Sequence, residues 1–343
     1  MKKIIALILA LMMILTIMAA CTDEPAEPVQ GTPAGEESAS EADDDEADEP
    51  DSIVTVIKPS DATPLMWLVT APDGQTMHLF GSMHVAKPTM YPLPETIMDA
   101  FYAADYLAVE IDMLAFINDE EAFMAYVLSR MYDDGMTIID EIGEELHARA
   151  VEVISGLDID LDGMPIEILD IFKPIVWWNE ILTAEAVELS ELSSDYGLDM
   201  FFLMKAYERG MSVLEVESIT AQMEVLLGFS TPLQMILLEG ALDIELAAEG
   251  IVELYEIYKY GDIEAIILMR EAILEEMPEG LGEEYYQGLL ANRDIGMTDA
   301  IEEYFAEEKS VFFIVGLLHM VGEGGIVDLL TQRGYEVELV AVN

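Results

Sequence analysis

The chain of 343 residues carries 69 acidic and only 14 basic side chains, which gives a formal net charge of −55 at pH 7. A surface this acidic repels nucleic acid and anionic lipid head groups, so the composition argues against a nucleic-acid-binding function. The chain has one cysteine, Cys21, so no disulfide can form within it and a disulfide-stabilised scaffold is excluded.

The first twenty residues have the pattern of a secretory signal peptide. Lys2 and Lys3 precede an uncharged run over 4–20, which is short of the about 20 apolar residues that a spanning helix needs. Small residues before Cys21 resemble a bacterial lipobox, with Met18 in place of the usual leucine. That resemblance implies cleavage before Cys21 and lipidation of its sulfur. An ordinary signal peptide or an uncleaved anchor is the alternative.

Residues 22–57 have the composition of a disordered stalk. They contain thirteen acidic residues and no Lys or Arg, mixed with Pro, Ala, Gly and Ser. Such a segment cannot bury enough apolar surface to fold, and its like charges keep it extended. The predicted organisation is a signal peptide over 1–20, a lipidated Cys21 with the acidic stalk over 21–57, and a folded domain over 58–343. The protein is then expected to be anchored by lipid to the extracytoplasmic face of the cell membrane.

Two short stretches near the ends of the folded part resemble each other. His78 to His84 and Phe313 to His319 are both apolar runs that close with a Gly-x-x-His motif, starting at Gly81 and Gly316. In each case a helix-like stretch and a second apolar run follow, over 95–104 and 106–111 in the first copy and over 326–333 and 335–342 in the second. This is the pattern of a parallel βαβ crossover.

We therefore expect an α/β fold in which two βαβ-like halves build a mixed or parallel sheet. Loops at the carboxyl ends of the strands line the binding crevice of such sheets, so His84 and His319 are predicted to meet there. Glycine at the strand end permits a sharp turn or the close approach of a ligand. A lone Gly-x-x-His is a weak signal, and it is the repetition of its surroundings that favours a functional site.

The segment between the two halves is predicted to be a large helical insertion, with a short strand over 212–216. Apolar residues recur there at three- and four-residue spacing, with Asp199, Thr231 and Pro232 as start signals and Gly210 and Gly261 as stop signals. The predicted helices cover residues 119–131, 140–154, 166–192, 198–209, 219–227, 232–260, 262–277 and 284–308.

Several blocks of residues resemble the TraB/PrgY/GumN family. They are Gly81-Ser82-Met83-His84, Tyr91-Pro92-Leu93-Pro94, Val109-Glu110-Ile111-Asp112, Leu198-Asp199, Val213 to Glu217 with Gln222, Asn292-Arg293 with Met297 and Ile301, Gly316 to His319 with Gly322, Glu323 and Gly325, and Arg333-Gly334-Tyr335. Their order and spacing, from about Trp67 to Val340, are more specific than any single block. Glu215 stands where many members have glycine.

This resemblance implies a fold related to the erythromycin-esterase and ChaN-like proteins, and an activity like that of the Tiki metal-dependent proteases. Carried over by position, the implied metal ligands are His84, His319 and Glu110. The implied catalytic residues are Glu110 and Arg293, with Glu217 as a second carboxylate. The implied cofactor is a divalent metal: manganese, cobalt or zinc.

The residue types support that chemistry. Imidazole and carboxylate ligands suit these metals better than thiolate-loving ions, and a bound metal acidifies water and polarises a carbonyl. A carboxylate can act as general base, and an arginine can stabilise an oxyanion. Each residue also has a structural explanation: Glu110 and Asp112 can be exposed, Glu217 can precede a helix, and Arg293 can pair with acidic neighbours. His78 is assigned to a strand surface and His147 to a solvated helix face.

The sequence thus predicts a surface-anchored, metal-dependent peptidase-like hydrolase that acts on an extracellular peptide or protein. A lipoprotein that sequesters a peptide or small ligand without cutting it is the alternative, and a haem- or metal-binding protein is a third possibility. The chain has no Gly-x-Ser-x-Gly elbow and no Gly-x-x-x-x-Gly-Lys phosphate loop.

Overall fold

A computed structural model describes residues 60–133, 135–157 and 164–342. The predicted signal peptide over 1–20, the lipidation site Cys21, the acidic stalk over 21–57 and the first residues of the predicted domain lie outside the described residues.

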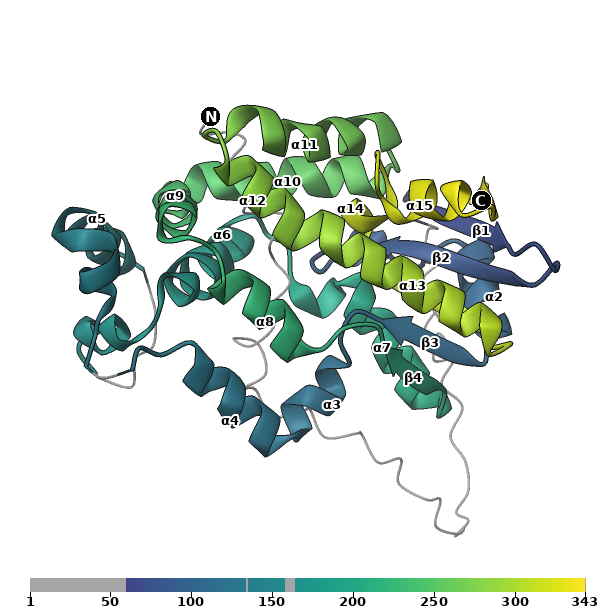
Figure 1. The fold of residues 1–343 in the computed structure, drawn as a ribbon, viewed down its shortest axis with the longest axis horizontal. Helices are drawn as coiled ribbons and strands as arrows, with labels where there is room; N and C mark the ends of the chain where they lie inside the picture. The colour runs from purple at the N-terminus through teal and green to yellow at the C-terminus, as the bar shows by residue number, and fades with distance from the viewer. Residues whose placement is uncertain (1–59, 134, 158–163, 343) are drawn as a thin grey trace, which may run out of the picture.

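A six-stranded sheet forms the centre of the described chain (Figure 1). Its strands are β1 (Met66–Thr70), β2 (Thr76–Ser82), β3 (Tyr106–Val109), β4 (Ser212–Glu215), β5 (Val311–Gly316) and β6 (Glu336–Leu339). They lie in the order β4-β3-β5-β2-β1-β6. The four strands β4, β3, β5 and β2 are parallel to one another, whereas β1 is antiparallel to both β2 and β6. The fold is therefore α/β. The sequence predicted a mixed or parallel sheet, and the sheet is mixed.

Strand β1 was not predicted. It forms a hairpin with β2 through Pro72-Asp73-Gly74, where Gly74 adopts a left-handed φ of 91° and the Ala71 amide donates to the Gln75 carbonyl at 2.8 Å. Proline, aspartate and glycine in this order are a strong turn signal, and reading it would have revealed the hairpin.

Both predicted crossovers are present, but their strands interleave. The first runs from β2 through α2 (Glu95–Ala103) to β3, and the second from β5 through α14 (Leu317–Met320) and α15 (Ile326–Gln332) to β6. Strand β5 lies between β2 and β3, so the strand that precedes the second motif pairs directly with the strand that precedes the first.

The chain between β3 and β5 is helical apart from β4, as predicted. Its α-helices are α3 (Met113–Asn118), α4 (Glu120–Ser129), α5 (Ile138–Ile154), α6 (Thr183–Leu189), α7 (Leu198–Arg209), α8 (Ile219–Leu227), α9 (Thr231–Ala241), α10 (Ile244–Lys259), α11 (Ile263–Glu276), α12 (Leu281–Tyr286) and α13 (Asn292–Ala306). Helix α7 ends at Gly210, whose φ of 65° provides the predicted left-handed stop.

Four of the predicted helices are interrupted. The predicted helix over 140–154 is kinked within α5 at Gly143, which has a φ of 80°. Residues 166–192 form a 3₁₀ segment (Ile166–Ile171), a π-helix (Val176–Leu182) and α6, because Pro174 forces the preceding residues out of the helical region. Residues 232–260 divide between α9 and α10 at Asp243, which has non-helical φ and ψ. Residues 284–308 contain a π-helix at Gln287–Ala291 between α12 and α13.

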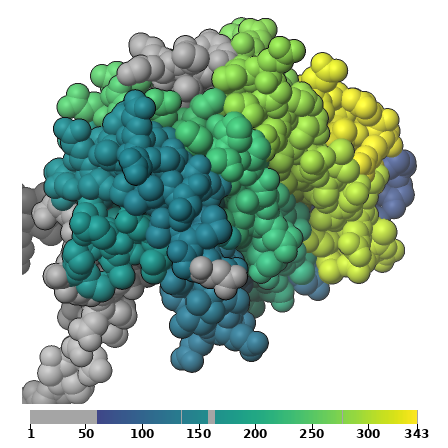
Figure 2. All heavy atoms as spheres, turned by 60° about the vertical axis from the view of Figure 1, so that its left-hand side comes forward, coloured from purple at the N-terminus to yellow at the C-terminus, as the bar shows by residue number. Residues whose placement is uncertain are grey.

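Aromatic side chains fix helices to the sheet. Phe202 of α7 packs against Phe80 of β2 and Phe312 of β5, and Phe101 of α2 packs against Phe202 and Phe312, with ring centroids 5.1 to 5.7 Å apart. Helix α13 crosses in front of the strands in Figure 1. Figure 2 shows the teal and green residues of the insertion covering much of the molecule, with the purple of the first strands at the right-hand edge.

No single helix in the described residues is long and apolar enough to span a membrane. The bent pair α8 and α9, which meet at 97°, passes that test together on length and composition alone.

Candidate functional site

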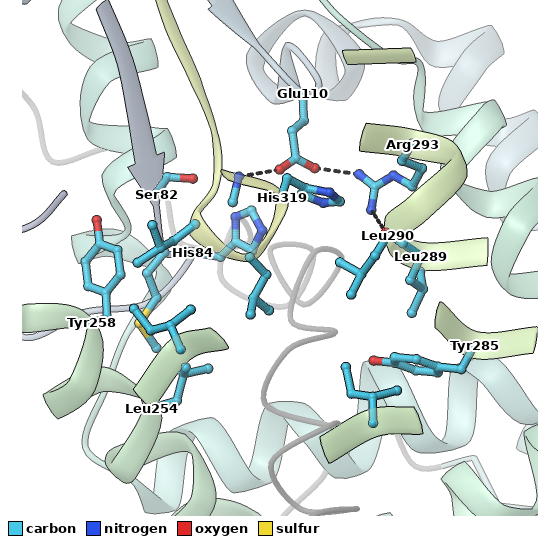
Figure 3. Close-up of a pocket in the computed structure, with 16 residues that line it drawn as sticks. Ser82, His84, Glu110, Leu254, Tyr258, Tyr285, Leu289, Leu290, Arg293 and His319 are labelled. Carbon is cyan, nitrogen blue, oxygen red and sulfur yellow. Dashed lines mark hydrogen bonds and ion pairs between the residues drawn. The ribbon is translucent and has the colours of Figure 1, made fainter. Parts of the chain in front are cut away.

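Both Gly-x-x-His histidines line one cavity, together with Glu110 and Arg293 (Figure 3). The space between its lining residues, with open solvent counted in, is about 740 Å³. Glu110 and Arg293 lie at one end of the close-up, and residues of the insertion, including Leu254 and Tyr285, lie toward the other. A mostly apolar cavity with a few converging polar groups is the usual form of a small-molecule or peptide side-chain site.

The sheet order brings the two motifs together. In the parallel pair β2 and β5, Ser82 is opposite Gly316, so the two following loops leave the same edge of the sheet. A Cβ atom on Gly81 would lie 2.4 Å from Leu317 Cδ1 and 3.1 Å from Leu317 Cα. The first glycine is thus required by the close approach of the second motif, and neither motif glycine has a left-handed φ.

The start of α7 brings a carboxylate to His84. The Leu198 amide donates to the Met83 carbonyl at 3.0 Å, and Gly197 lies so close that a Cβ would be 2.2 Å from the His84 carbonyl oxygen. This docking places Asp199 Oδ2 2.8 Å from His84 Nδ1, an ion-pair distance without hydrogen-bond alignment. The other oxygen of Asp199 accepts from the Ser82 hydroxyl.

His84 is electrostatically perturbed in the metal-free protein. Burial alone would lower its pKa, but the negative charge of Asp199, followed by that of Glu110, outweighs burial and raises the pKa to about 9. The imidazole of the first motif therefore carries a positive charge at neutral pH when no other ligand occupies its ring.

His319 is held by a different carboxylate. Its Nδ1 lies 2.6 Å from Asp294 Oδ1 in hydrogen-bond geometry, and Asp294 is fully buried. Asp294 Oδ2 accepts from Arg270 at 2.7 Å. Among the described residues no hydrogen bond is made to Nε2 of either His84 or His319, so both rings keep that nitrogen for a ligand.

Glu110 bridges the two motifs. Its Oε1 accepts from the Gly316 amide at 2.7 Å, and its Oε2 accepts from Arg293 at 2.7 Å and Gln222 at 3.1 Å. Burial opposes ionisation of Glu110, but the charge of Arg293 and then of His319 and His84 outweighs it and holds the pKa well below its usual range. The carboxylate is therefore ionised and well supplied with donors.

Arg293 joins the second carboxylate to the cluster. Its Nε and Nη2 donate to Glu217 at 2.6 to 3.0 Å, while Nη1 donates to the Leu289 carbonyl at 3.3 Å. Glu217 reaches the cluster through Arg293 and is not among the side chains that line the cavity. Leu289 belongs to the π-helix that precedes α13, and such segments are frequent at functional sites.

His84 and Glu110 also line a second, smaller cavity. Asp199 and Gln222 line it together with apolar residues of β3, α3 and α7. The Gln222 side-chain oxygen is buried without a hydrogen-bond partner. His84 and Glu110 therefore line both cavities.

The donor set fits a divalent metal in part. Metal-bound histidines almost always donate their other ring N–H to a carboxylate, and both Nδ1 atoms contact one here. Oε1 of Glu110 accepts a single hydrogen bond and keeps a lone pair. In the described part of the chain, however, no three His, Cys, Asp or Glu side chains come close enough to form a ligand group. Of the three implied metal ligands, the imidazoles of His84 and His319 have the surroundings of metal-binding groups.

Sequence reasoning missed the partners of both histidines. Asp199 was noted as a helix start and a motif residue, and Asp294 directly follows Arg293, but neither was assigned to a histidine. Arg270 was not considered. Acidic residues in the first turn of a helix were a visible signal. What the sequence does not give is the packing of those helix starts against the two motif loops.

Two other assignments changed with the structure. Asp112 caps α3 by accepting from the Ala115 amide, and it also accepts from the Tyr207 hydroxyl, so it is a structural residue. His147 does not lie on a solvated face as predicted: its Nε2 is 2.8 Å from Asp170, and its ring packs 5.5 Å from that of Trp177. His78 lies in β2, half-buried, where burial lowers its pKa.

Comparison with known proteins gives distant relatives. The chain is similar to the uncharacterized protein YbaP of Escherichia coli strain K12, with 20% identity over 274 residues that cover 76% of this chain and 90% of YbaP. The YbaP protein of Shigella flexneri matches with the same identity and coverage. No solved structure matches at a significant level. The model of the TraB/PrgY/gumN family matches residues 65–339, which include every residue of the cluster, and the chain therefore belongs to the TraB/PrgY/gumN family.

Proposed function

We propose that this protein is a hydrolase of the metal-dependent peptidase type, acting on an extracellular peptide or protein. The observation that carries the proposal is the convergence of two histidine–carboxylate pairs on one cavity that also holds the buried pair of Glu110 and Arg293. Paired imidazoles oriented by carboxylates are suited to moving a proton to and from water.

Each group has a distinct part in the proposed reaction. In this reaction the Nε2 atoms of His84 and His319, which make no hydrogen bond within the described residues, would act on the water and the peptide carbonyl. Arg293 has five N–H groups, and its Nη1 keeps one after donating to Leu289. That N–H and the buried positive charge are suited to stabilising the oxyanion of a tetrahedral intermediate. Glu110 fixes Arg293 and the Gly316 amide in place.

A divalent metal held by His84 and His319 would acidify the attacking water and polarise the carbonyl. Manganese, cobalt and zinc suit imidazole and carboxylate ligands. Because Glu110 Oε2 is occupied by Arg293 and Gln222, Oε1 is the oxygen that would have to move toward the two histidines to serve as a third ligand. The engagement of Glu110 favours a second candidate, in which the histidines act as general acid and base without a metal.

The cavity lining indicates the part of the substrate that is bound. Leu254, Ile266, Ile273, Leu289 and Leu290, all from the helical insertion, form its apolar walls. They suit an apolar side chain next to the reacting bond. The same lining supports the non-catalytic alternative, a lipoprotein that sequesters a peptide or small ligand.

The placement of the protein is part of the proposal. The signal-like segment over 1–20 and the lipobox-like Cys21 would anchor the chain to the extracytoplasmic face of the membrane, and the acidic stalk would hold the domain away from it. Mass spectrometry of the protein purified from membranes should find a diacylglyceryl group on Cys21 that is absent after Cys21→Ala.

The test of the activity is peptide cleavage by the purified protein. A mixed peptide library, with and without added manganese, cobalt or zinc, is followed by mass spectrometry for the wild type and for the H84A/H319A double variant. The matched control is H78A/H147A, which removes the two histidines outside the cavity. Metal-dependent cleavage that is lost only in H84A/H319A supports the proposal. Cleavage that survives chelation supports the metal-free candidate, whereas stoichiometric ligand binding without cleavage supports the sequestering protein.

A further inference from the structure

Arg270 is one of the most deeply buried charged residues in the described chain. It lies on α11, is 2% exposed, and donates to three acceptors. Nη2 donates to Asp294 at 2.7 Å and to the Tyr286 hydroxyl at 3.1 Å, and Nη1 donates to the Leu318 carbonyl. Burying a guanidinium is costly unless it is paired and hydrogen-bonded, and here both conditions are met.

The surroundings of Arg270 all belong to the second histidine motif or to its support. Leu318 precedes His319, and a Cβ on Gly322 would lie 3.2 Å from Arg270 Cδ, so the chain after the motif wraps closely around this side chain. Asp294 contacts Arg270 through Oδ2 and His319 through Oδ1. The three side chains form a continuous, buried line from α11 to the cavity.

Only one of the two histidines has this support. At the first motif, Asp199 contacts His84 and accepts from the neutral Ser82 hydroxyl, and no arginine of the described residues pairs with it. The Asp294 carboxylate, in contrast, is fixed in position from behind by a cation with a rigid fork of donors.

We propose that Arg270 is a positioning residue for His319. By holding Asp294 and the Leu318 carbonyl, it fixes the imidazole in the tautomer that carries its proton on Nδ1, with the Nε2 lone pair directed at the cavity. Because an ionised carboxylate can only accept a hydrogen bond, the contact between Asp294 and His319 Nδ1 requires that Nδ1 carries the proton. The inference rests on the proposed function only in assigning that lone pair to water or metal; the tautomer itself does not depend on activity.

The tautomer can be measured directly. Long-range ¹H–¹⁵N correlation spectra of the metal-free full chain, labelled with ¹⁵N-histidine, distinguish a protonated ring nitrogen from one with a lone pair. The chain has four histidines, so single His→Gln variants assign every ring. At mildly alkaline pH the wild type should give one set of His319 signals, with the proton on Nδ1.

Three variants test the line of contacts. Asp294→Asn removes the obligate acceptor, so the Nδ1–H signals should be replaced by a mixture of tautomers. Arg270→Met removes the fork and should give the same loss, while Arg270→Lys keeps the charge but not the geometry and should give an intermediate result. Arg130→Met is the matched control, because Arg130 is also buried and paired, with Glu180, outside the cavity. It should lose stability without changing the His319 signals.

Metal affinity provides a second measurement. Loss of a group that orients a metal-binding histidine typically weakens binding by about 10- to 100-fold, and calorimetric titration with zinc should find that loss in Asp294→Asn and Arg270→Met but not in Arg130→Met.

Wild-type signals with the proton on Nε2, or a folded Arg270→Lys and Arg270→Met with unchanged signals, would overturn the proposal. If Arg270→Met does not fold, Arg270→Lys and Asp294→Asn decide. A wild type that hydrolyses no peptide yet shows the Nδ1–H tautomer would refute the proposed function alone.

Discussion

The two Gly-x-x-His motifs follow adjacent parallel strands but differ in what holds them. The helical insertion contacts a backbone carbonyl in each: Tyr258 donates to Gly81 at 2.8 Å, and Arg270 donates to Leu318. Tyr258 is a neutral donor and Arg270 is a charged one. The carboxylates that contact the two rings differ in their partners in the same way, since Asp199 accepts from the neutral Ser82 hydroxyl and Asp294 accepts from the Arg270 guanidinium. In this fold the repeated motif determines where each histidine lies, whereas the inserted helices determine its electrostatic surroundings.

The largest effect should come from removing what the two motifs share. Arg293→Met leaves the buried Glu110 and the partly buried Glu217 without the cation that pairs with both, and we expect it to lower the free energy of unfolding by about 3 to 5 kcal/mol in urea titrations. Arg333→Met, which breaks surface pairs with Asp299 and Glu302, should cost at most about 1 kcal/mol. Equal losses in the two variants would contradict the central role of Arg293.

The motif glycines should differ in their tolerance of a methyl group. In Gly81→Ala the new Cβ would overlap Leu317, including its backbone, and such overpacking typically costs about 1 to 3 kcal/mol. In Gly316→Ala the nearest atom is Glu110 Oε1 at 3.3 Å, so a smaller loss of stability is expected. Thermal unfolding of both variants measures the difference, and a more destabilising Gly316→Ala would reverse the assignment of the close approach to Gly81.

The first histidine should make stability depend on pH in the metal-free protein. Because the folded-state pKa of His84 is raised to about 9 from an ordinary value near 6.5, its contribution is complete below about pH 6.5 and is lost as pH rises toward 9. Urea titrations across this range should find a decline that is smaller in Asp199→Asn, which removes the main charge partner. An equal decline in both proteins would show that another group is responsible.

The smallest effects should come from the histidines outside the cavity. His147→Gln loses a partly buried contact with Asp170, so we expect a change of about 0.5 to 1.5 kcal/mol in unfolding free energy. Neither His147→Gln nor His78→Gln should change zinc affinity. A loss of zinc in either variant would relocate the metal site.

Local signals allowed much of the fold to be predicted from the sequence. The bounds of α7 and α8 matched because helix starts and a stop glycine are encoded within a few residues, and the strands before both histidines were recognised by their apolar runs. Strand order was not predictable in this way, because nothing local states that β5 pairs with β2. The meeting of His84 and His319 was predicted from the repeated strand and Gly-x-x-His pattern, whereas the addition of Glu110 and Arg293 came from family resemblance. The partners Asp199, Asp294 and Arg270 depend on contacts between distant segments, which periodicity does not encode.

The position of β5 sets the order in which the site can be assembled. When the chain is made from its N-terminus, β2 and β3 are complete long before residues 311–316 arrive to fill the gap between them. Until then both apolar strands present open edges, which are templates for aggregation, and such late long-range pairing slows folding. A newly made chain therefore passes through a stage in which His84 is present but the cavity that it shares with His319 is not, because His319 follows β5.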